Sequence, residues 1–129
     1  MSQIFNQDFQ DFLTAFEDAN VEYVLVGGYS VIIHGYNRTT GDMDLLVNPT
    51  SDNYSKIKVA FKHFGMPLFG MTLEKFLDSE NFDVFEYGRP PVSIDIITKI
   101  KGVSYIEASE NAIRYKISDD LTINVIQVL

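Results

Sequence analysis

The sequence predicts a single domain of the α/β (α+β) class, in which helices flank a mixed β-sheet. Segments with helical and strand periodicity alternate along the chain, and no linker or internal repeat separates them. The 129 residues match the length of one ordinary domain. A hydrophobic fraction of 46%, with 10 Phe and 7 Tyr, is sufficient for a substantial core.

The elements are expected in the following order. An amphipathic helix comes first, because five apolar residues recur at three- and four-residue intervals: Phe5, Phe9, Phe12, Leu13 and Phe16. The apolar run at 23–26 predicts a buried strand, and 29–34 predicts a short buried helix. The later elements are a strand at 43–47, a helix from a Thr50 or Ser51 cap to about Phe64, a short helix at 72–77, strands at 83–87 and 92–98, a helix at 104–111, and a hairpin of strands at 113–117 and 121–128.

Charge and composition exclude several classes of protein. Ten basic and 18 acidic residues give a net charge of −8, which argues against broad nucleic-acid binding but not against a local anion site. The absence of cysteine excludes a disulfide framework, a thiolate zinc site and a cysteine nucleophile. The acidic N-terminal segment does not resemble a signal peptide, and no apolar run is long enough to span a membrane. We therefore expect a cytoplasmic protein.

The first candidate site residues are two carboxylates at the start of the second predicted strand. In an extended segment Asp42 and Asp44 point to the same face, and Met43 points to the other. Two adjacent carboxylates repel each other unless a proton or cation lies between them, and Mg²⁺ prefers such oxygen ligands. The pair is therefore a candidate magnesium site. The alternative is a solvated loop edge, because this spacing is common.

A third carboxylate, Asp95, interrupts an apolar strand. Alternation places Ser93, Asp95 and Ile97 on one face of that strand. An unpaired carboxylate is costly to bury, so a metal shared with the first two acids would explain its position. Three strand-borne carboxylates are what a two-metal phosphoryl- or nucleotidyl-transfer site requires. The alternatives are an ion pair with Arg38 or Lys99, or exposure on an edge strand.

Small and polar residues around these acids suit a phosphate. Gly27 and Gly28 follow a strand and open a helix, where the backbone can approach a phosphate group. Tyr29 or Ser30 could add a hydroxyl donor. Arg38 precedes the acids, and a guanidinium suits a triphosphate. The alternatives are an ordinary turn for the glycines and, for Arg38, neutralisation of the two acids that follow it.

Together these motifs resemble the nucleotidyltransferase superfamily, whose catalytic core is similar to that of DNA polymerase β. The resemblance covers about residues 21–100 and rests on Val26-Gly27-Gly28, on Arg38-Thr39-Thr40-Gly41-Asp42-Met43-Asp44-Leu45 and on Ile94-Asp95-Ile96. The form of the second motif is similar to that of the abortive-infection toxin-like and the aminoglycoside- or lincosamide-resistance-like branches. The resemblance implies one nucleotidyltransferase-like domain over residues 1–129.

The resemblance also implies an activity and a set of residue roles. The activity is metal-dependent transfer of a nucleoside monophosphate from an NTP to a hydroxyl of a tRNA, a protein or a small molecule. Asp42 and Asp44 would hold Mg²⁺, and Asp95 would complete the two-metal site and assist deprotonation of the acceptor. The nucleotide-binding residues would be Gly27, Gly28, Ser30 and Arg38.

The chain departs from these branches after its last strands. Their members usually continue into further helices that bind the acceptor, whereas this sequence ends at Val128-Leu129. We therefore expect a small helical protein or a second copy to supply that surface, as in a toxin–antitoxin pair. Two alternatives stay open: a non-catalytic nucleotide-binding or regulatory module with the same fold, and a metal-dependent phosphohydrolase that uses the same acids.

Overall fold

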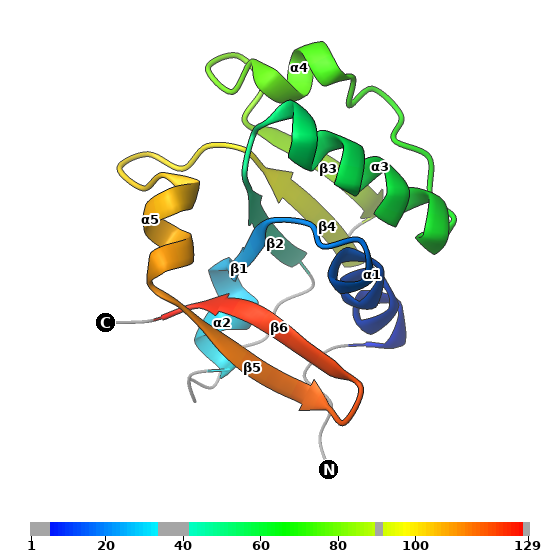
Figure 1. Cartoon of the computed structure of the whole chain (residues 1–129), viewed down its shortest axis with the longest axis vertical. Helices are drawn as coiled ribbons and strands as arrows, with labels where there is room; N and C mark the ends of the chain where they lie inside the picture. Colours follow the sequence, from blue (N-terminus) through cyan, green and yellow to red (C-terminus); the bar gives the residue numbers. More distant parts are fainter. Residues whose placement is uncertain (1–5, 34–41, 90–91, 128–129) are drawn as a thin grey trace.

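The computed structural model describes residues 6–33, 42–89 and 92–127. These residues form a six-stranded mixed sheet and five helices, which confirms the mixed α+β class (Figure 1). The helices are α1 (Gln7–Asp18), α2 (Gly27–Ile33), α3 (Ser51–Phe64), α4 (Leu73–Leu77) and α5 (Tyr105–Glu110). The strands are β1 (Tyr23–Val26), β2 (Asp42–Val47), β3 (Val84–Arg89), β4 (Val92–Ile97), β5 (Ala112–Ser118) and β6 (Leu121–Ile126).

Each expected element is present, with boundaries shifted by a few residues. Four helices begin at a polar residue whose side chain accepts a hydrogen bond from a backbone N–H three residues later: Asn6, Thr50, Thr72 and Ser104. Thr50, rather than Ser51, therefore caps α3. This helix ends at Gly65, whose φ of 89° is readily adopted only by glycine.

The sheet order is β3-β4-β2-β1-β6-β5, so strands distant in sequence become neighbours. Strand β2 pairs antiparallel with β1 and parallel with β4. Strand β4 also pairs antiparallel with β3, and β6 pairs parallel with β1 and antiparallel with β5. The centre of the sheet is thus β4-β2-β1, and β3 and β5 form its edges.

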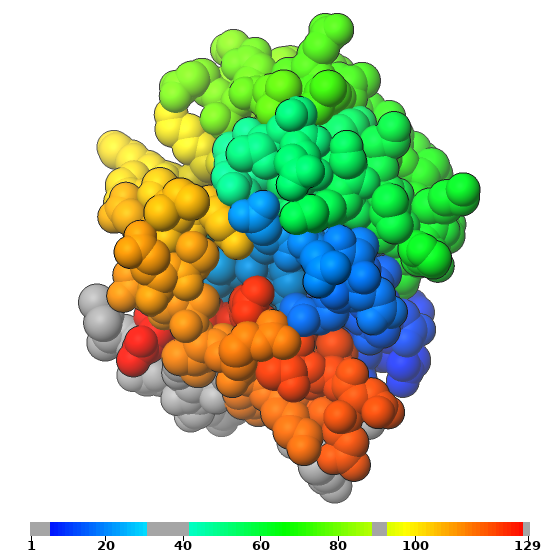
Figure 2. Space-filling view, in the orientation of Figure 1, coloured from blue at the N-terminus to red at the C-terminus, as the bar shows by residue number. Residues whose placement is uncertain are grey.

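Helices α1 and α3 pack against each other over one face of the sheet, and their surfaces adjoin in Figure 2. The main core lies beneath them. It contains the buried residues of α1 predicted from the apolar periodicity, including Phe12 and Phe16, and the aromatic rings of Phe61 and Tyr87. A smaller apolar cluster lies on the opposite face, where Ala108 of α5 packs near Val24 and Leu46. Both faces of the central strands are therefore covered along part of their length.

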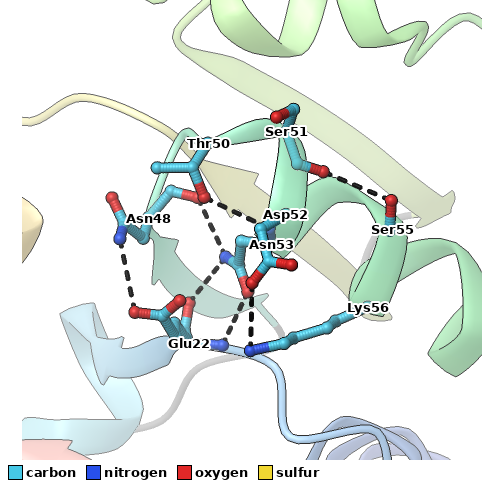
Figure 3. A network of polar contacts seen from close by, with 8 residues as sticks. All are labelled: Glu22, Asn48, Thr50, Ser51, Asp52, Asn53, Ser55 and Lys56. Carbon is cyan, nitrogen blue, oxygen red and sulfur yellow. Dashed lines mark hydrogen bonds and ion pairs between the residues drawn. The ribbon is translucent and has the colours of Figure 1, made fainter.

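A buried amide joins the start of α3 to two strands of the sheet (Figure 3). Asn53 is fully buried, and its Oδ1 accepts a hydrogen bond of 2.8 Å from the backbone N–H of Glu22. Its Nδ2 donates to the carbonyl oxygens of Glu22 at 3.0 Å and Asn48 at 2.9 Å. Because Glu22 immediately precedes β1 and Asn48 immediately follows β2, Asn53 fixes these two strand ends relative to each other.

We predict that Asn53→Ala lowers the free energy of unfolding by about 2–4 kcal/mol, because three hydrogen bonds are lost and backbone groups are left without partners. Urea unfolding would measure the change. Ser55→Ala is the control, since Ser55 is exposed on the same helix and its hydroxyl makes only a 3.3 Å bond to the Ser51 carbonyl. An effect of Asn53→Ala as small as that of the control would contradict the role assigned to the amide.

Candidate functional site

The three acids predicted from sequence lie on one face of the sheet, on two adjacent strands. Asp44 and Asp95 are direct neighbours in the parallel pairing of β2 and β4, and Asp42 lies beside Ser93. Adjacent strands are about 4.8 Å apart, which is within reach of carboxylate side chains. The opposite face of β2 carries Met43, which is fully buried in the main core. The sequence-based alternation is therefore confirmed for both strands.

Asp42 lies at the exposed start of β2 and has a defined polar neighbour. The Ser93 hydroxyl donates a hydrogen bond of 2.6 Å to Asp42 Oδ1. Tyr29 interacts electrostatically with this carboxylate. Burial raises the pKa of the Tyr29 phenol, and the negative charge of Asp42 raises it further. The Tyr29 ring is held by an edge-on contact with Phe9, with centroids 5.5 Å apart. Asp42 is thus oriented from the neighbouring strand.

Asp44 and Asp95 form a hydrogen-bonded carboxyl pair, and such a pair requires a proton. Burial is the main cause that raises the pKa of both groups. The pKa of Asp95 rises to about 6 because the hydrogen bond to Asp44 and the charges of Asp44, Glu86 and Asp42 all add to the effect of burial. The same hydrogen bond acts on Asp44 in the opposite direction and lowers its pKa against the larger effect of burial.

One oxygen of this pair has no hydrogen-bond partner. Asp95 Oδ1 is buried, and no donor lies within hydrogen-bond distance of it among the described residues. Such an atom is costly unless a cation, a proton donor or water uses its lone pairs. The described residues nevertheless contain no group of three or more His, Cys, Asp or Glu side chains already arranged to hold a metal ion.

Gly27 lies directly against Asp44. A Cβ atom at Gly27 would lie 2.3 Å from Asp44 Oδ2, so any side chain here would displace the Asp44 carboxylate. Its φ of 73° is also in the left-handed region, which glycine adopts without strain. The junction between β1 and α2 therefore needs glycine for two independent reasons. Gly27 thus lies beside one of the predicted acids, and its role at a nucleotide stays a prediction.

The other residues predicted to bind nucleotide have different positions. Gly28 is buried, and Ser30 is buried with its hydroxyl donating to the Gly27 carbonyl at 2.8 Å. Ser30 therefore supports the Gly27 backbone from within the fold. Arg38 lies outside the described residues, so its predicted role stays a prediction. The structure brings together Asp42, Asp44, Asp95 and Gly27.

Two simpler explanations for Asp95 are wrong. Strand β4 lies between β3 and β2, so Asp95 is not on an edge strand. Lys99 forms an ion pair of 2.6 Å with Glu80 and is not the partner of Asp95. The carboxyl group therefore lies within the sheet face, and its described neighbours are other acids.

A fourth acid, Glu86, was missed by the sequence reasoning. It lies directly opposite Asp95 in the antiparallel pairing of β3 and β4, and its charge contributes to the raised pKa of Asp95. The sequence did contain a signal: antiparallel pairing that starts from Arg89 and Val92 places Glu86 opposite Asp95. Asp44, Asp95 and Glu86 thus form a row across three adjacent strands.

Comparisons with known proteins do not assign this chain to a family. No protein-family model matches it, and a search of curated proteins found no significant match. Among the described residues, no helix combines the length and apolar character that a membrane span requires. The arguments below therefore depend on the residues themselves.

We predict that Asp95→Asn stabilises the protein at pH 7.5 and has little effect near pH 4. The folded-state pKa of Asp95 is about 6, above the ordinary value of 3.8. Protonated Asp95 therefore makes its full contribution to the free energy of unfolding below pH 3.8. That stability is lost as the pH rises through 6. A neutral amide removes this loss, and we expect a gain of a few degrees in Tm at pH 7.5, corresponding to about 1 kcal/mol after solvent screening.

Thermal unfolding at both pH values measures this difference. Asp83→Asn is the control, because Asp83 is an exposed acid immediately before β3 and outside the row of carboxyl groups. If Asp95→Asn raised Tm equally at both pH values, or lowered it at pH 7.5, the electrostatic account of Asp95 would be wrong.

Proposed function

We propose that this chain is a nucleotidyltransferase-like enzyme that transfers a nucleoside monophosphate from an NTP to an acceptor hydroxyl. The observation that carries the proposal is the position of Asp42, Asp44 and Asp95 on one face of two adjacent strands, with the Gly27 backbone against Asp44. Phosphoryl and nucleotidyl transfer need carboxylates that gather divalent cations beside a backbone able to approach phosphate oxygens.

In this proposal Asp42 and Asp44 hold the divalent cation and Asp95 completes the site. A bound Mg²⁺ would neutralise phosphate charge and make the acceptor hydroxyl easier to deprotonate. The donor set fits: all three residues offer oxygen ligands, and the buried Asp95 Oδ1 has no described partner to displace. Below a pKa of about 6, the proton on Asp95 would compete with the cation for this site.

The remaining residues have supporting roles. Gly27 is exposed and leaves the backbone beside Asp44 open, while Gly28 and Ser30 lie behind it. Ser93 positions Asp42 through its 2.6 Å hydrogen bond. We place Arg38 at the triphosphate on the sequence motif alone. Asp95, which holds a proton with a pKa of about 6, would accept the proton of the acceptor hydroxyl once ionised.

The context we propose takes account of the net charge. With a net charge of −8, the chain needs a local basic strip or a basic partner if the acceptor is a tRNA. An acceptor hydroxyl on a protein or a small molecule requires neither a basic strip nor a basic partner. We propose a cytoplasmic protein that works with a small helical partner or a second copy, as in toxin–antitoxin pairs.

One observation favours a second candidate, a non-catalytic module with the same fold that binds a nucleotide or regulates a partner. Asp44 and Asp95 hydrogen-bond to each other, and no group of three or more His, Cys, Asp or Glu in the described ranges is arranged for a metal. A chain that had lost catalysis could keep these acids as a proton-sharing pair. The two functions differ in whether a divalent cation displaces the proton.

We therefore predict that Mg²⁺ or Mn²⁺ raises Tm, and that the rise is larger at pH 7.5 than at pH 5. The sign follows from competition, because below a pKa of about 6 the proton on Asp95 opposes the cation. Differential scanning fluorimetry measures the shift. We expect Asp44→Asn to abolish it and Asp83→Asn to leave it intact. A shift that is the same at both pH values, or that persists in Asp44→Asn, would place cation binding elsewhere.

Catalysis is tested by label transfer. The protein is incubated with Mg²⁺ and each α-labelled NTP, with and without total tRNA or cell extract. We expect label to move to an acceptor, and we expect Asp42→Ala and Asp44→Ala to lower transfer by about 100-fold or more, because metal-assisted charge stabilisation is lost. Asp83→Asn should retain the wild-type rate.

Other outcomes separate the alternatives. NTP-dependent stabilisation without label transfer would favour the non-catalytic module. Release of free phosphate without label transfer would instead favour a phosphohydrolase. If neither NTP nor Mg²⁺ changed Tm, the nucleotide-binding proposal itself would fail.

A further inference from the structure

Strand β3 is an edge strand whose outer side is open to pairing. The backbone N–H of Thr98 donates to the Asp83 carbonyl at 2.9 Å, which identifies these two as a hydrogen-bonded pair of the β3–β4 ladder. Because such pairs alternate along an antiparallel ladder, Val84 and Glu86 direct their N–H and C=O groups away from β4. No turn or loop hydrogen bond reaches these groups within the described residues.

The two edge strands, β3 and β5, differ in how readily they would pair with an additional strand. On β5, Arg114 and Lys116 are exposed at alternate positions, and charged residues of this kind discourage the addition of another strand. The β3 edge instead exposes Val84 at 43% and, just before the strand, Phe82 at 38%. Apolar exposure on an open edge favours the addition of a strand, so β3 is the edge suited to a partner.

A groove runs beside this edge. Its volume is about 290 Å³, and it lies between β3 on one side and the segment 68–71 with Lys75 of α4 on the other. Phe69 forms part of its wall and is 74% exposed, with a φ of 54° that is unfavourable for a residue with a side chain. The Phe69 ring also lies 6.2 Å from the ring of Tyr87. The groove thus offers apolar contacts alongside the outward backbone groups of β3.

The charge of the sheet determines what kind of strand fits. Glu86 lies on the same face as Asp95 and Asp44, so a residue added beside Glu86 would extend a row of acids. Like charges on neighbouring strands are destabilising, and opposite charges are stabilising. An acidic residue there is therefore disfavoured, and antiparallel pairing with the β3 of a second copy about Glu86 would place two glutamates opposite each other. A basic residue is favoured.

We propose that the β3 edge binds an extended segment of a partner protein, in which Lys or Arg alternates with apolar residues, as an added strand. A basic side chain of the segment lies beside Glu86 on the acidic face. Its alternate residues point to the other face, on the side of Phe85 and Tyr87, where the exposed ring of Phe69 provides an apolar surface. Main-chain hydrogen bonds to Val84 and Glu86 supply affinity, and the alternation supplies specificity. This proposal does not depend on the enzymatic one.

The probe is a fluorescein-labelled synthetic peptide of alternating Val and Lys, about eight residues long, and binding is measured by fluorescence anisotropy. We expect the same peptide with Glu in place of Lys to bind at least about ten-fold more weakly. Glu86→Lys should reverse this preference. Val84→Pro should weaken binding of the Lys peptide about ten-fold, because it removes an outward N–H without touching the pairing with β4.

Asp120→Lys is the matched control, since it makes the same change in net charge in the turn between β5 and β6. If it weakened the Lys peptide as much as Glu86→Lys did, binding would reflect the overall charge of −8 and the proposal would be overturned. The proposal would also fail if neither Glu86→Lys nor Val84→Pro changed the affinity. Sedimentation showing a wild-type dimer that Val84→Pro dissociates would assign the edge to a second copy instead.

Discussion

The arrangement of the site depends on one buried side chain, the amide of Asn53. It bonds the backbone before β1 and after β2, and so fixes the register in which these strands pair. Register matters here because a slip of one residue turns every side chain of a strand to the opposite face. In β2 such a slip would drive Asp44 into the aromatic core beneath α1 and α3 and expose Met43. A polar contact at one end of the strands therefore determines where the carboxylates lie at the other.

The carboxyl groups of the site destabilise the folded state. Asp44, Asp95 and Glu86 lie on adjacent strands, and no basic residue among the described ones pairs with either aspartate. Burial and mutual repulsion raise the pKa of Asp95 to about 6, so near neutral pH the folded state carries an electrostatic cost. Sheets do not gather acids in this way for stability, and clusters of perturbed groups of this kind are typical of functional sites.

Much of this architecture could be predicted from the sequence, because local rules govern it. Apolar periodicity located α1 and α3, polar caps located helix starts, and strand alternation put Ser93 and Asp95 on one face. Long-range pairing is different. Nothing local determines that β4 lies beside β2 with Asp95 opposite Asp44, and that register creates the carboxyl pair. Likewise, Asn53 is a polar residue in a surface-like helical pattern, and only the packing shows that it is fully buried. Ser30 was expected beside a nucleotide, and the sequence pattern did not indicate that its hydroxyl donates to the Gly27 carbonyl.

The parallel pairing of β2 with β4 also has a consequence for how the protein folds. The Ser93–Asp42 hydrogen bond joins residues 51 positions apart, and the intervening segment contains α3, α4 and β3. In the unfolded chain Asp44 and Asp95 are far apart and do not repel each other. Their repulsion begins only when this long loop closes, a step that is slow for topological reasons alone. The part of the electrostatic cost that comes from the Asp44–Asp95 contact therefore arises late in folding, after the hairpin of β3 and β4 and the local helices have had time to form.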